Sequence, residues 1–261
     1  MTTWAPGSLA PAPATAPLGR MLVSQARAEL TLVLRNGEQV LLSLVVPLGL
    51  LVVLTAIPFV SVDGADTRAE RADFFVPGVL ALAVMSTAFT GQAIGVGFER
   101  QYGVLKRLGA TPLPRAVLLC AKTLAVLAVE ILQVLLIVAV GLALGWQPRG
   151  SALVVLLLVA LGTAAFSGLG LLLGGTLPGL TTLAAANLIW LVLLVIGGIL
   201  FPLSAFGGAE PILSLLPTAA LSGGLREVLQ GGAGLPVREV LALAVCAVGA
   251  LTLASRLFRW E

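Results

Sequence analysis

Histidine is absent from this 261-residue sequence, which contains only two cysteines and two lysines. Without histidine, the chain cannot build a histidine-dependent catalytic triad, the common catalytic zinc sites or a histidine-ligated haem. Cys120 and Cys246 both lie inside apolar runs, so a disulfide framework is not expected and the thiols should behave as small apolar groups. These shortages exclude many enzyme classes before any motif is considered.

A phosphate-binding loop of the form GxxxxGK[ST] is also missing. The lysines are Lys106 and Lys122. Lys122 precedes a threonine, but it follows Cys120-Ala121 and not a glycine-rich loop. We therefore expect no ATPase site, no metal site and no cofactor bound by this chain itself.

Charge is scarce, and its scarcity sets the fold class. Charged residues make up 10% of the chain, hydrophobic residues make up 59%, and the mean hydropathy is +1.09. Residues 39–62, 74–98 and 150–209 contain no charged side chain. One membrane span needs roughly 20 apolar residues, so these runs predict an all-α, polytopic membrane protein.

Six transmembrane helices fit the apolar runs. They are expected at about residues 39–60, 75–98, 116–146, 151–174, 183–201 and 240–258. Residues 1–19 are rich in Ala and Pro, uncharged and unlike a signal peptide, which predicts a disordered tail. Residues 20–37 alternate apolar side chains with Arg20, Arg27 and Arg35, which indicates an interfacial amphipathic helix before a membrane domain at 38–259.

The positions of Lys and Arg predict the orientation. With the N-terminus inside, ten basic residues face the cytoplasm and five face outward, so both termini should be cytoplasmic. Residues 62–73 then form an outer loop. Residues 202–239 also lie outside, and their interrupted apolar pattern, with Pro217 and later Arg226, predicts re-entrant helices before the last span.

Residues 98–115, FERQYGVLKRLGATPLPR, concentrate charge between the second and third predicted spans. One interpretation is a loop that only sets topology. However, residues 101–108 read as one or two helical turns, and Gly109, Pro112 and Pro114 end them sharply. Arg100 and Arg107 are seven positions apart, so on one helix they would face the same partner.

The run Glu99, Arg100, Gly103, Leu105, Arg107, Leu108, Thr111 and Pro112 resembles the pattern after the second span of ABC-2 type exporter permeases, a group that includes daunorubicin-resistance-like permeases. Leu216-Pro217 and Leu225-Arg226 resemble the family's outer segment. The resemblance covers residues 20–259. It implies a bacterial cell-membrane exporter of a drug, lipid or metabolite.

The same resemblance implies the partners. The loop after the second span would be a coupling helix that docks on a separate ATPase, which would hold ATP and Mg²⁺. Carried over, the docking contacts are Glu99, Arg100, Gly103, Lys106, Arg107 and Leu108. A second copy of the chain would pair with the first as a homodimer within the lipid bilayer.

Two polar residues lie within the third predicted span. Glu130 and Gln133 share one helix face, and they fit either a conduit or interface role or simple packing. Lys122 is interpreted as snorkelling to the inner surface. Three Gly-x-x-x-Gly pairs, at 91/95, 141/145 and 170/174, are interpreted as close helix packing within the chain.

Other function classes stay open at this point. An ion- or proton-coupled transporter would need several buried acids, and only Glu130 qualifies. An intramembrane enzyme would lack both histidine and paired intramembrane carboxylates. A membrane scaffold without transport activity fits the same composition. The basic residues lie beside apolar runs, so nucleic acid is not an expected partner.

Overall fold

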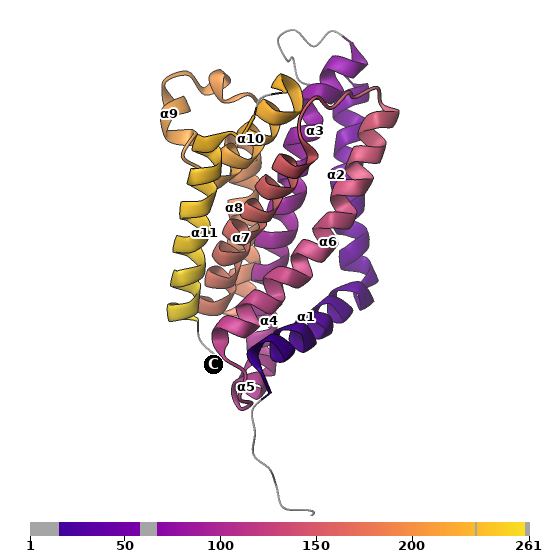
Figure 1. Ribbon diagram of the computed structural model, residues 1–261. Coiled ribbons are helices and arrows are strands. Elements are labelled where there is room, and N and C mark those ends of the chain that lie inside the picture. Colours follow the sequence, from indigo (N-terminus) through magenta and orange to yellow (C-terminus); the bar gives the residue numbers. More distant parts are fainter. Residues whose placement is uncertain (1–15, 58–66, 233, 259–261) are drawn as a thin grey trace, which may run out of the picture.

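The computed structural model describes residues 16–57, 67–232 and 234–258, and regular structure in these ranges is helical (Figure 1). The helices are α1 (Leu18–Arg35), α2 (Gly37–Ala56), α3 (Arg68–Val84), η1 (Met85–Gly91), α4 (Gln92–Gln101), α5 (Val104–Gly109), α6 (Arg115–Ala143), α7 (Ala152–Thr176), α8 (Gly179–Ile196), η2 (Leu203–Ala209), α9 (Glu210–Leu213), α10 (Pro217–Gly231) and α11 (Val237–Leu257).

Five of these elements are long and apolar enough to cross a membrane: Arg68–Gln101, Arg115–Ala143, Ala152–Thr176, Gly179–Ile196 and Val237–Leu257. The described apolar part of α2, Ser43–Ala56, is shorter and runs beside them. The protein is therefore an all-helical, polytopic membrane protein with five to six long apolar helices, as the composition predicted.

The most buried span is one continuous helix built from α3, η1 and α4. It begins at a capping box: Thr67 N–H donates to Oε2 of Glu70 at 2.7 Å, and Glu70 N–H donates to Oγ1 of Thr67 at 3.3 Å. The helix thus starts before residue 75, and residues 68–73 are helical where an outer loop was predicted. Residues 62–66 of that predicted loop lie outside the described residues, as does most of the predicted tail.

A π-helical segment, η1, forms the middle of this span. Such wide turns are rare and often occur at functional sites. Two hydroxyls of the segment bind neighbouring helices: Nε1 of Trp190 donates to Oγ of Ser86 at 2.8 Å, and Nε2 of Gln133 donates to Oγ1 of Thr87 at 2.9 Å. The π-segment is therefore held from both α8 and α6.

The glycine pairs behave differently from one another. A Cβ at Gly170 would lie 2.6 Å from the carbonyl oxygen of Phe89, and Gly174 is packed equally closely against Ala93, so the 170/174 prediction is confirmed. The 141/145 prediction is wrong for its second member, because α6 ends at Ala143 and Gly145, with φ of 95°, forms a turn. At 91/95 no neighbour lies within 4 Å of a Cβ at Gly95, so close packing is not observed there.

Two prolines inside the spans free a carbonyl group, because proline has no N–H to donate to the residue four positions earlier. Pro47 in α2 frees the carbonyl of Ser43, which accepts from Nε2 of Gln133 at 2.9 Å. Pro77 in α3 frees the carbonyl of Asp73, which accepts from Nε2 of Gln230 at 2.7 Å. In each case a glutamine from a distant helix supplies the missing donor.

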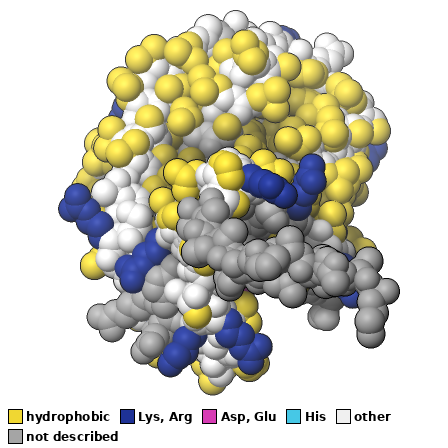
Figure 2. Space-filling view, turned by 60° about the horizontal axis from the view of Figure 1, so that its bottom comes forward, with side chains coloured by type: hydrophobic (Ala, Val, Ile, Leu, Met, Phe, Trp, Pro, Cys, Tyr) yellow, Lys and Arg dark blue, Asp and Glu magenta, His cyan; other side chains and the backbone are white. Residues whose placement is uncertain are grey.

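The two ends of the bundle carry different numbers of described basic residues. We call them the α5 end, which also carries α1 and the C-terminus of α11, and the α10 end, which carries η2, α9 and α10. The described basic residues at the α5 end are Arg20, Arg27, Arg35, Arg100, Lys106, Arg107, Arg115, Lys122 and Arg256, and those at the α10 end are Arg68, Arg71, Arg149, Arg226 and Arg238. Figure 2 shows Lys and Arg side chains gathered where the α5 end turns forward.

Short helices fill the predicted outer segment, with one change. Pro217 does not interrupt a helix but occupies its first turn, where a missing N–H costs nothing. Gly223 and Gly224 lie inside α10, and a Cβ at Gly224 would lie only 3.2 Å from Cβ of Glu239. The small residue allows α10 to approach α11 closely.

Candidate functional site

The basic segment between the second and third predicted spans includes a separate short helix, α5, at the α5 end. Gly103, with φ of 72°, ends α4 and redirects the chain. Leu105 is fully buried in a small apolar cluster with Val96, Leu118 and Phe258. This anchor fixes α5 against the ends of three long helices.

The six residues predicted as docking contacts divide by exposure. Lys106 and Arg107 are exposed, whereas Glu99, Arg100, Gly103 and Leu108 are partly buried. Tyr102, 69% exposed, and Val104, 41% exposed, were not predicted, although their position beside the charged residues could have indicated them. The outward face of α5 therefore mixes two cations with two apolar side chains.

The expectation that Arg100 and Arg107 share one helix is wrong. Arg100 belongs to α4, Arg107 belongs to α5, and the left-handed Gly103 separates them. Arg100 instead lines a hollow of about 340 Å³ together with Gln101, Pro178 and Gly179 at the α7–α8 turn. Its Nη1 has no hydrogen-bond partner among the described residues.

Helix α1 lies against α6 and beside α5. Its three arginines, Arg20, Arg27 and Arg35, are all exposed. Arg20 also lines a hollow of about 350 Å³ whose other wall includes Leu108 and Thr111 from the α5 segment. The N-terminal helix and α5 thus form one continuous surface.

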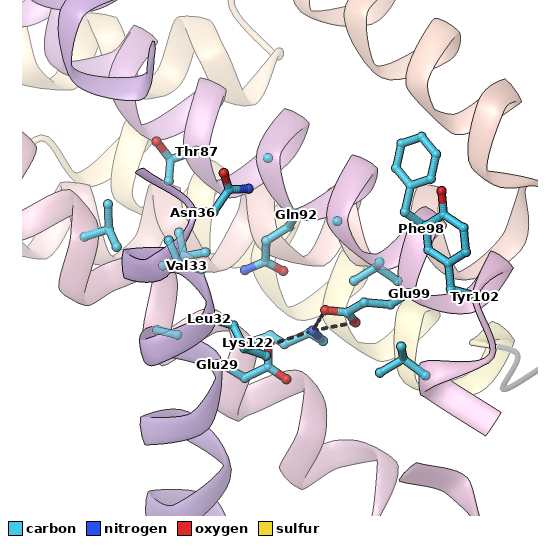
Figure 3. A pocket seen from close by; sticks show the side chains of 17 residues that line it. Glu29, Leu32, Val33, Asn36, Thr87, Gln92, Phe98, Glu99, Tyr102 and Lys122 are labelled. Carbon is cyan, nitrogen blue, oxygen red and sulfur yellow. Dashed lines mark hydrogen bonds and ion pairs between the residues drawn. The ribbon is translucent and has the colours of Figure 1, made fainter. Parts of the chain in front are cut away.

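A buried cluster of three charges joins α1, α4 and α6 (Figure 3). Nζ of Lys122 lies 2.8 Å from Oε2 of Glu29 and 2.7 Å from Oε2 of Glu99. The side chains of Lys122 and Glu29 are 6% and 8% exposed. The prediction that Lys122 reaches the inner surface is therefore wrong, because two carboxylates satisfy its ammonium inside the protein.

Sequence reasoning missed the role of Glu29, which is one of the polar residues of the predicted interfacial helix. In the structure, Leu18, Val23, Leu32 and Leu34 are exposed large apolar side chains of α1, whereas Glu29 is buried. Nε2 of Gln25 donates to its second carboxylate oxygen at 2.8 Å. Nothing in the local pattern signals this, because its partner lies 93 positions away.

The two polar residues of α6 lie in different surroundings. Gln133 connects three helices, since it donates to the carbonyl of Ser43 and to Thr87. Glu130 is fully buried and accepts a hydrogen bond from the hydroxyl of Thr163 in α7. No described basic side chain forms an ion pair with Glu130, and its Oε1 has no hydrogen-bond partner among the described atoms.

Arg226, in α10, is a partly buried cation at the α10 end. Its guanidinium donates to the carbonyls of Gly198 and Phe74 and, at 3.1 Å, to that of Ile199. It also lies 4.1 Å above the ring of Phe74. Burial lowers the pKa of Arg226 to about 10, so the side chain keeps its charge at neutral pH. Pro217 starts the helix that holds it.

The chain is similar in sequence to known proteins over most of its length. Residues 22–229 match the family described as ABC-2 type transporter. The chain belongs to the ABC-2 type transporter family. A protein of Bacillus subtilis (strain 168) named "Putative transport permease YvfS" is 25% identical over 221 residues, which is 81% of this chain and 86% of that protein.

Family membership fixes the general role. The chain is the membrane permease subunit of an ABC-2 type transporter, and this kind of domain carries no ATPase activity. ABC-2 permeases work with ABC ATPase subunits, which agrees with the missing phosphate-binding loop. The matched range includes both Lys122 and Arg226.

Proposed function

We propose that the chain exports a hydrophobic or amphipathic molecule, such as a drug, lipid or metabolite, from the cytoplasm of a bacterial cell. A separate ATPase, with ATP and Mg²⁺ bound, drives the cycle by pushing on α5. The observation that carries this proposal is the anchored helix α5, which combines a fully buried Leu105 with exposed Lys106 and Arg107.

A short helix that is fixed at one side can transmit a displacement, whereas a flexible loop would absorb it. Leu105 packs on residues of α4 and α6 and on Phe258 after α11, so a push on α5 reaches three long helices. Leu108, which is partly buried, lies beside the exposed pair and borders the hollow between α5 and α1. Exposed Arg20 and Arg27 extend the docking surface along α1.

The proposed orientation places the α5 end in the cytoplasm. The described basic residues favour that end, which agrees with the positive-inside rule. The apolar substrate class is supported by the spans, whose exposed side chains are largely Leu, Val and Ile. The long apolar helices offer few charged groups that would bind a polar solute.

We further propose a homodimer in which α8 contributes to the interface. Helix α8 is the least buried of the five spans. Asn187 lies near its middle and is exposed, with its own Nδ2 donating to the carbonyl of Leu183 at 3.0 Å. An exposed amide within a lipid-facing span is unfavourable, and a second copy would cover it.

The docking test compares capture of the ATPase by the wild-type permease and by Lys106→Glu/Arg107→Glu. We expect the variant to insert in the membrane normally but to lose both the captured ATPase and ATP-dependent export. Arg149→Glu/Arg238→Glu makes the same charge change at exposed positions of the α10 end and should leave both unchanged. Undiminished capture by the α5 variant would refute docking at α5.

The dimer test uses disulfide cross-linking in membranes, in a background with Cys120 and Cys246 replaced by Ser. Asn187→Cys should yield a cross-linked dimer. Val245→Cys, 72% exposed on α11, should stay monomeric. The reverse pattern would remove α8 from the proposed interface.

A further inference from the structure

A cavity of about 450 Å³ lies between α1, the α3–η1–α4 span, α5 and α6, beside the buried charge cluster (Figure 3). Small-molecule pockets typically have volumes of roughly 300–1,000 Å³, so the space suits a drug-sized ligand. Most of the lining is apolar, including Leu32, Val33, Val96 and Val126. Tyr102 and Val104 border both this cavity and the α5 face, but Lys106 and Arg107, at which the ATPase is proposed to dock, do not line the cavity.

The charged side chains that line the cavity are Glu29, Glu99 and Lys122. Two carboxylates against one ammonium leave a net charge of −1 in largely buried surroundings. An uncompensated charge in such surroundings is unfavourable, and a bound cation would neutralise it. The electrostatics of this cavity therefore select for positive charge.

A buried amide gives an independent sign of a ligand. Gln92 is 7% exposed and lines the cavity, and its Nε2 donates to Oγ of Ser167 at 3.0 Å. Its Oε1 is buried and has no hydrogen-bond partner among the described residues. An N–H group on a bound molecule would satisfy this acceptor.

Aromatic rings close one end of the cavity. Phe98 and Tyr102 both line it, and their rings stack with centroids 6.0 Å apart. Figure 3 shows these rings at the opposite end from Thr87 and Asn36, with the carboxylates between them. Aromatic faces attract ammonium groups and also pack against apolar ligand bodies.

We propose that this cavity binds a lipophilic organic cation, with the positive centre near Glu99 and Glu29 and the apolar body against the aromatic and aliphatic walls. A ligand N–H would donate to Oε1 of Gln92. The inference rests on the proposed function in one respect: such a cation would be the exported substrate. Binding itself requires only the permease.

The test uses the purified full-length permease in lipid nanodiscs, without any ATPase, and measures binding of tritiated tetraphenylphosphonium. Tetraphenylborate has nearly the same shape and the opposite charge, so it separates charge selection from apolar partition. We expect saturable binding of the cation and competition by unlabelled cation but not by the anion. Equal competition by both ions would overturn the proposal.

Variants then reverse the selectivity. Glu29→Gln/Glu99→Gln leaves Lys122 as the only charged lining residue, and we expect cation affinity to fall roughly tenfold or more while tetraphenylborate begins to bind. The control Glu210→Gln/Glu227→Gln removes two exposed acids elsewhere and should bind like wild type. Unchanged cation affinity in the Glu29/Glu99 variant would overturn the proposal.

Glu99→Gln alone guards against misfolding of the double variant, because it keeps the Glu29–Lys122 pair that fastens α1. It should elute as wild type in size-exclusion chromatography and still lose most cation binding.

The hydrogen bond to Gln92 is tested separately with two competing cations, because tributylammonium carries an N–H that tetrabutylammonium lacks. The first should compete roughly fivefold better in wild type and equally in Gln92→Leu, and equal competition in wild type would remove Gln92 from the site.

The ammonium group of a zwitterionic lipid headgroup presents similar chemistry to a free cation. Nanodiscs of phosphatidylglycerol with and without phosphatidylethanolamine distinguish the two sources. Weaker tetraphenylphosphonium binding with phosphatidylethanolamine would support the cation site and assign it to lipid, and equal binding would support a free cation. Cation binding in the cavity together with undiminished ATPase capture by Lys106→Glu/Arg107→Glu would refute only the docking proposal. Loss of ATPase capture by that variant without charge-selective cation binding would refute only the cation site.

Discussion

Lys122 is a buried cation and Arg226 a partly buried one, and they lie at opposite ends of the bundle. Lys122 is held by two carboxylates and stands beside a cavity, so its surroundings carry an excess negative charge. Arg226 donates hydrogen bonds to neutral backbone carbonyls and packs against an aromatic ring. The comparison indicates that Arg226 holds neighbouring segments together at the α10 end. At the α5 end, Lys122 lies beside a cavity with a net negative charge.

The largest effect is expected from Lys122→Met, which leaves Glu29 and Glu99 buried together without a cation. Breaking a buried ion pair by removing one partner costs about 3–5 kcal/mol of unfolding free energy. The apparent Tm, measured in detergent by fluorescence-detected size-exclusion chromatography, should fall sharply. The neutral variant Glu29→Gln/Glu99→Gln/Lys122→Met should recover most of that loss, and a Tm equal to wild type for Lys122→Met would contradict the cluster.

Next in size is Arg226→Met, which leaves the carbonyls of Gly198 and Ile199 without their donor. Hydrogen bonds from charged groups contribute about 1.5–3 kcal/mol, so a loss of about 2–3 kcal/mol is expected in the same assay. Arg226→Lys should fall in between, because lysine keeps the charge but not the planar arrangement of donors. Arg238→Met, at an exposed arginine, is the control and should leave the Tm in place.

A smaller effect is expected at the two proline–glutamine pairs. Gln230→Leu leaves the carbonyl of Asp73 unsatisfied and should cost about 1–2 kcal/mol. In a Pro77→Ala background the restored N–H can serve that carbonyl, so the cost of Gln230→Leu should nearly vanish. A double-mutant cycle measures this coupling, and additive losses would refute the pairing.

The matching pair at Pro47 sharpens the comparison between the ends. Gln133 also binds Thr87 in the π-segment, so Pro47→Ala should rescue Gln133→Leu only in part. Full rescue would mean that the bond between Gln133 and Thr87 contributes little. Partial rescue would show that α6 supports both α2 and η1.

The smallest effect is expected from Glu130→Gln. Thr163 donates to Glu130, and no described cation forms an ion pair with it, so a neutral amide of the same shape should change stability by about 1 kcal/mol or less. ATP-dependent export in inside-out vesicles should continue at a similar rate. Loss of export with normal folding would favour the proton-coupled class.

Much of the architecture could be predicted from the sequence because apolar run length directly reports membrane helices. Residues 152–176 and 237–257 illustrate this, since no charge or proline interrupts the central part of either helix. The early start of α3 depends on the Thr67–Glu70 cap, which was read as part of a charged loop. Gly103 was recognised as part of a motif, but its left-handed conformation, which separates Arg100 from Arg107, was not foreseen.

The candidate site was harder to predict, because it depends on pairs that are distant in sequence. The local sequence around Glu29 and Lys122 predicts no buried contact, because the first lies on an amphipathic helix and the second near a helix end. Only the folded arrangement places both beside Glu99 and shows that the carboxylates outnumber the ammonium. The hydrogen bonds from glutamines to the carbonyls that Pro47 and Pro77 leave free could not be predicted for the same reason.

The distance in sequence between Glu29 and Lys122 also has a consequence for synthesis. At roughly 5–20 residues per second, the ribosome needs roughly 5–20 s to add the 93 positions that separate them. During that interval α1 has no buried ammonium to receive its carboxylate, and α2 and the α3–η1–α4 span are made before α6 provides one. The first helix of the chain to be made is thus among the later ones to take its final place.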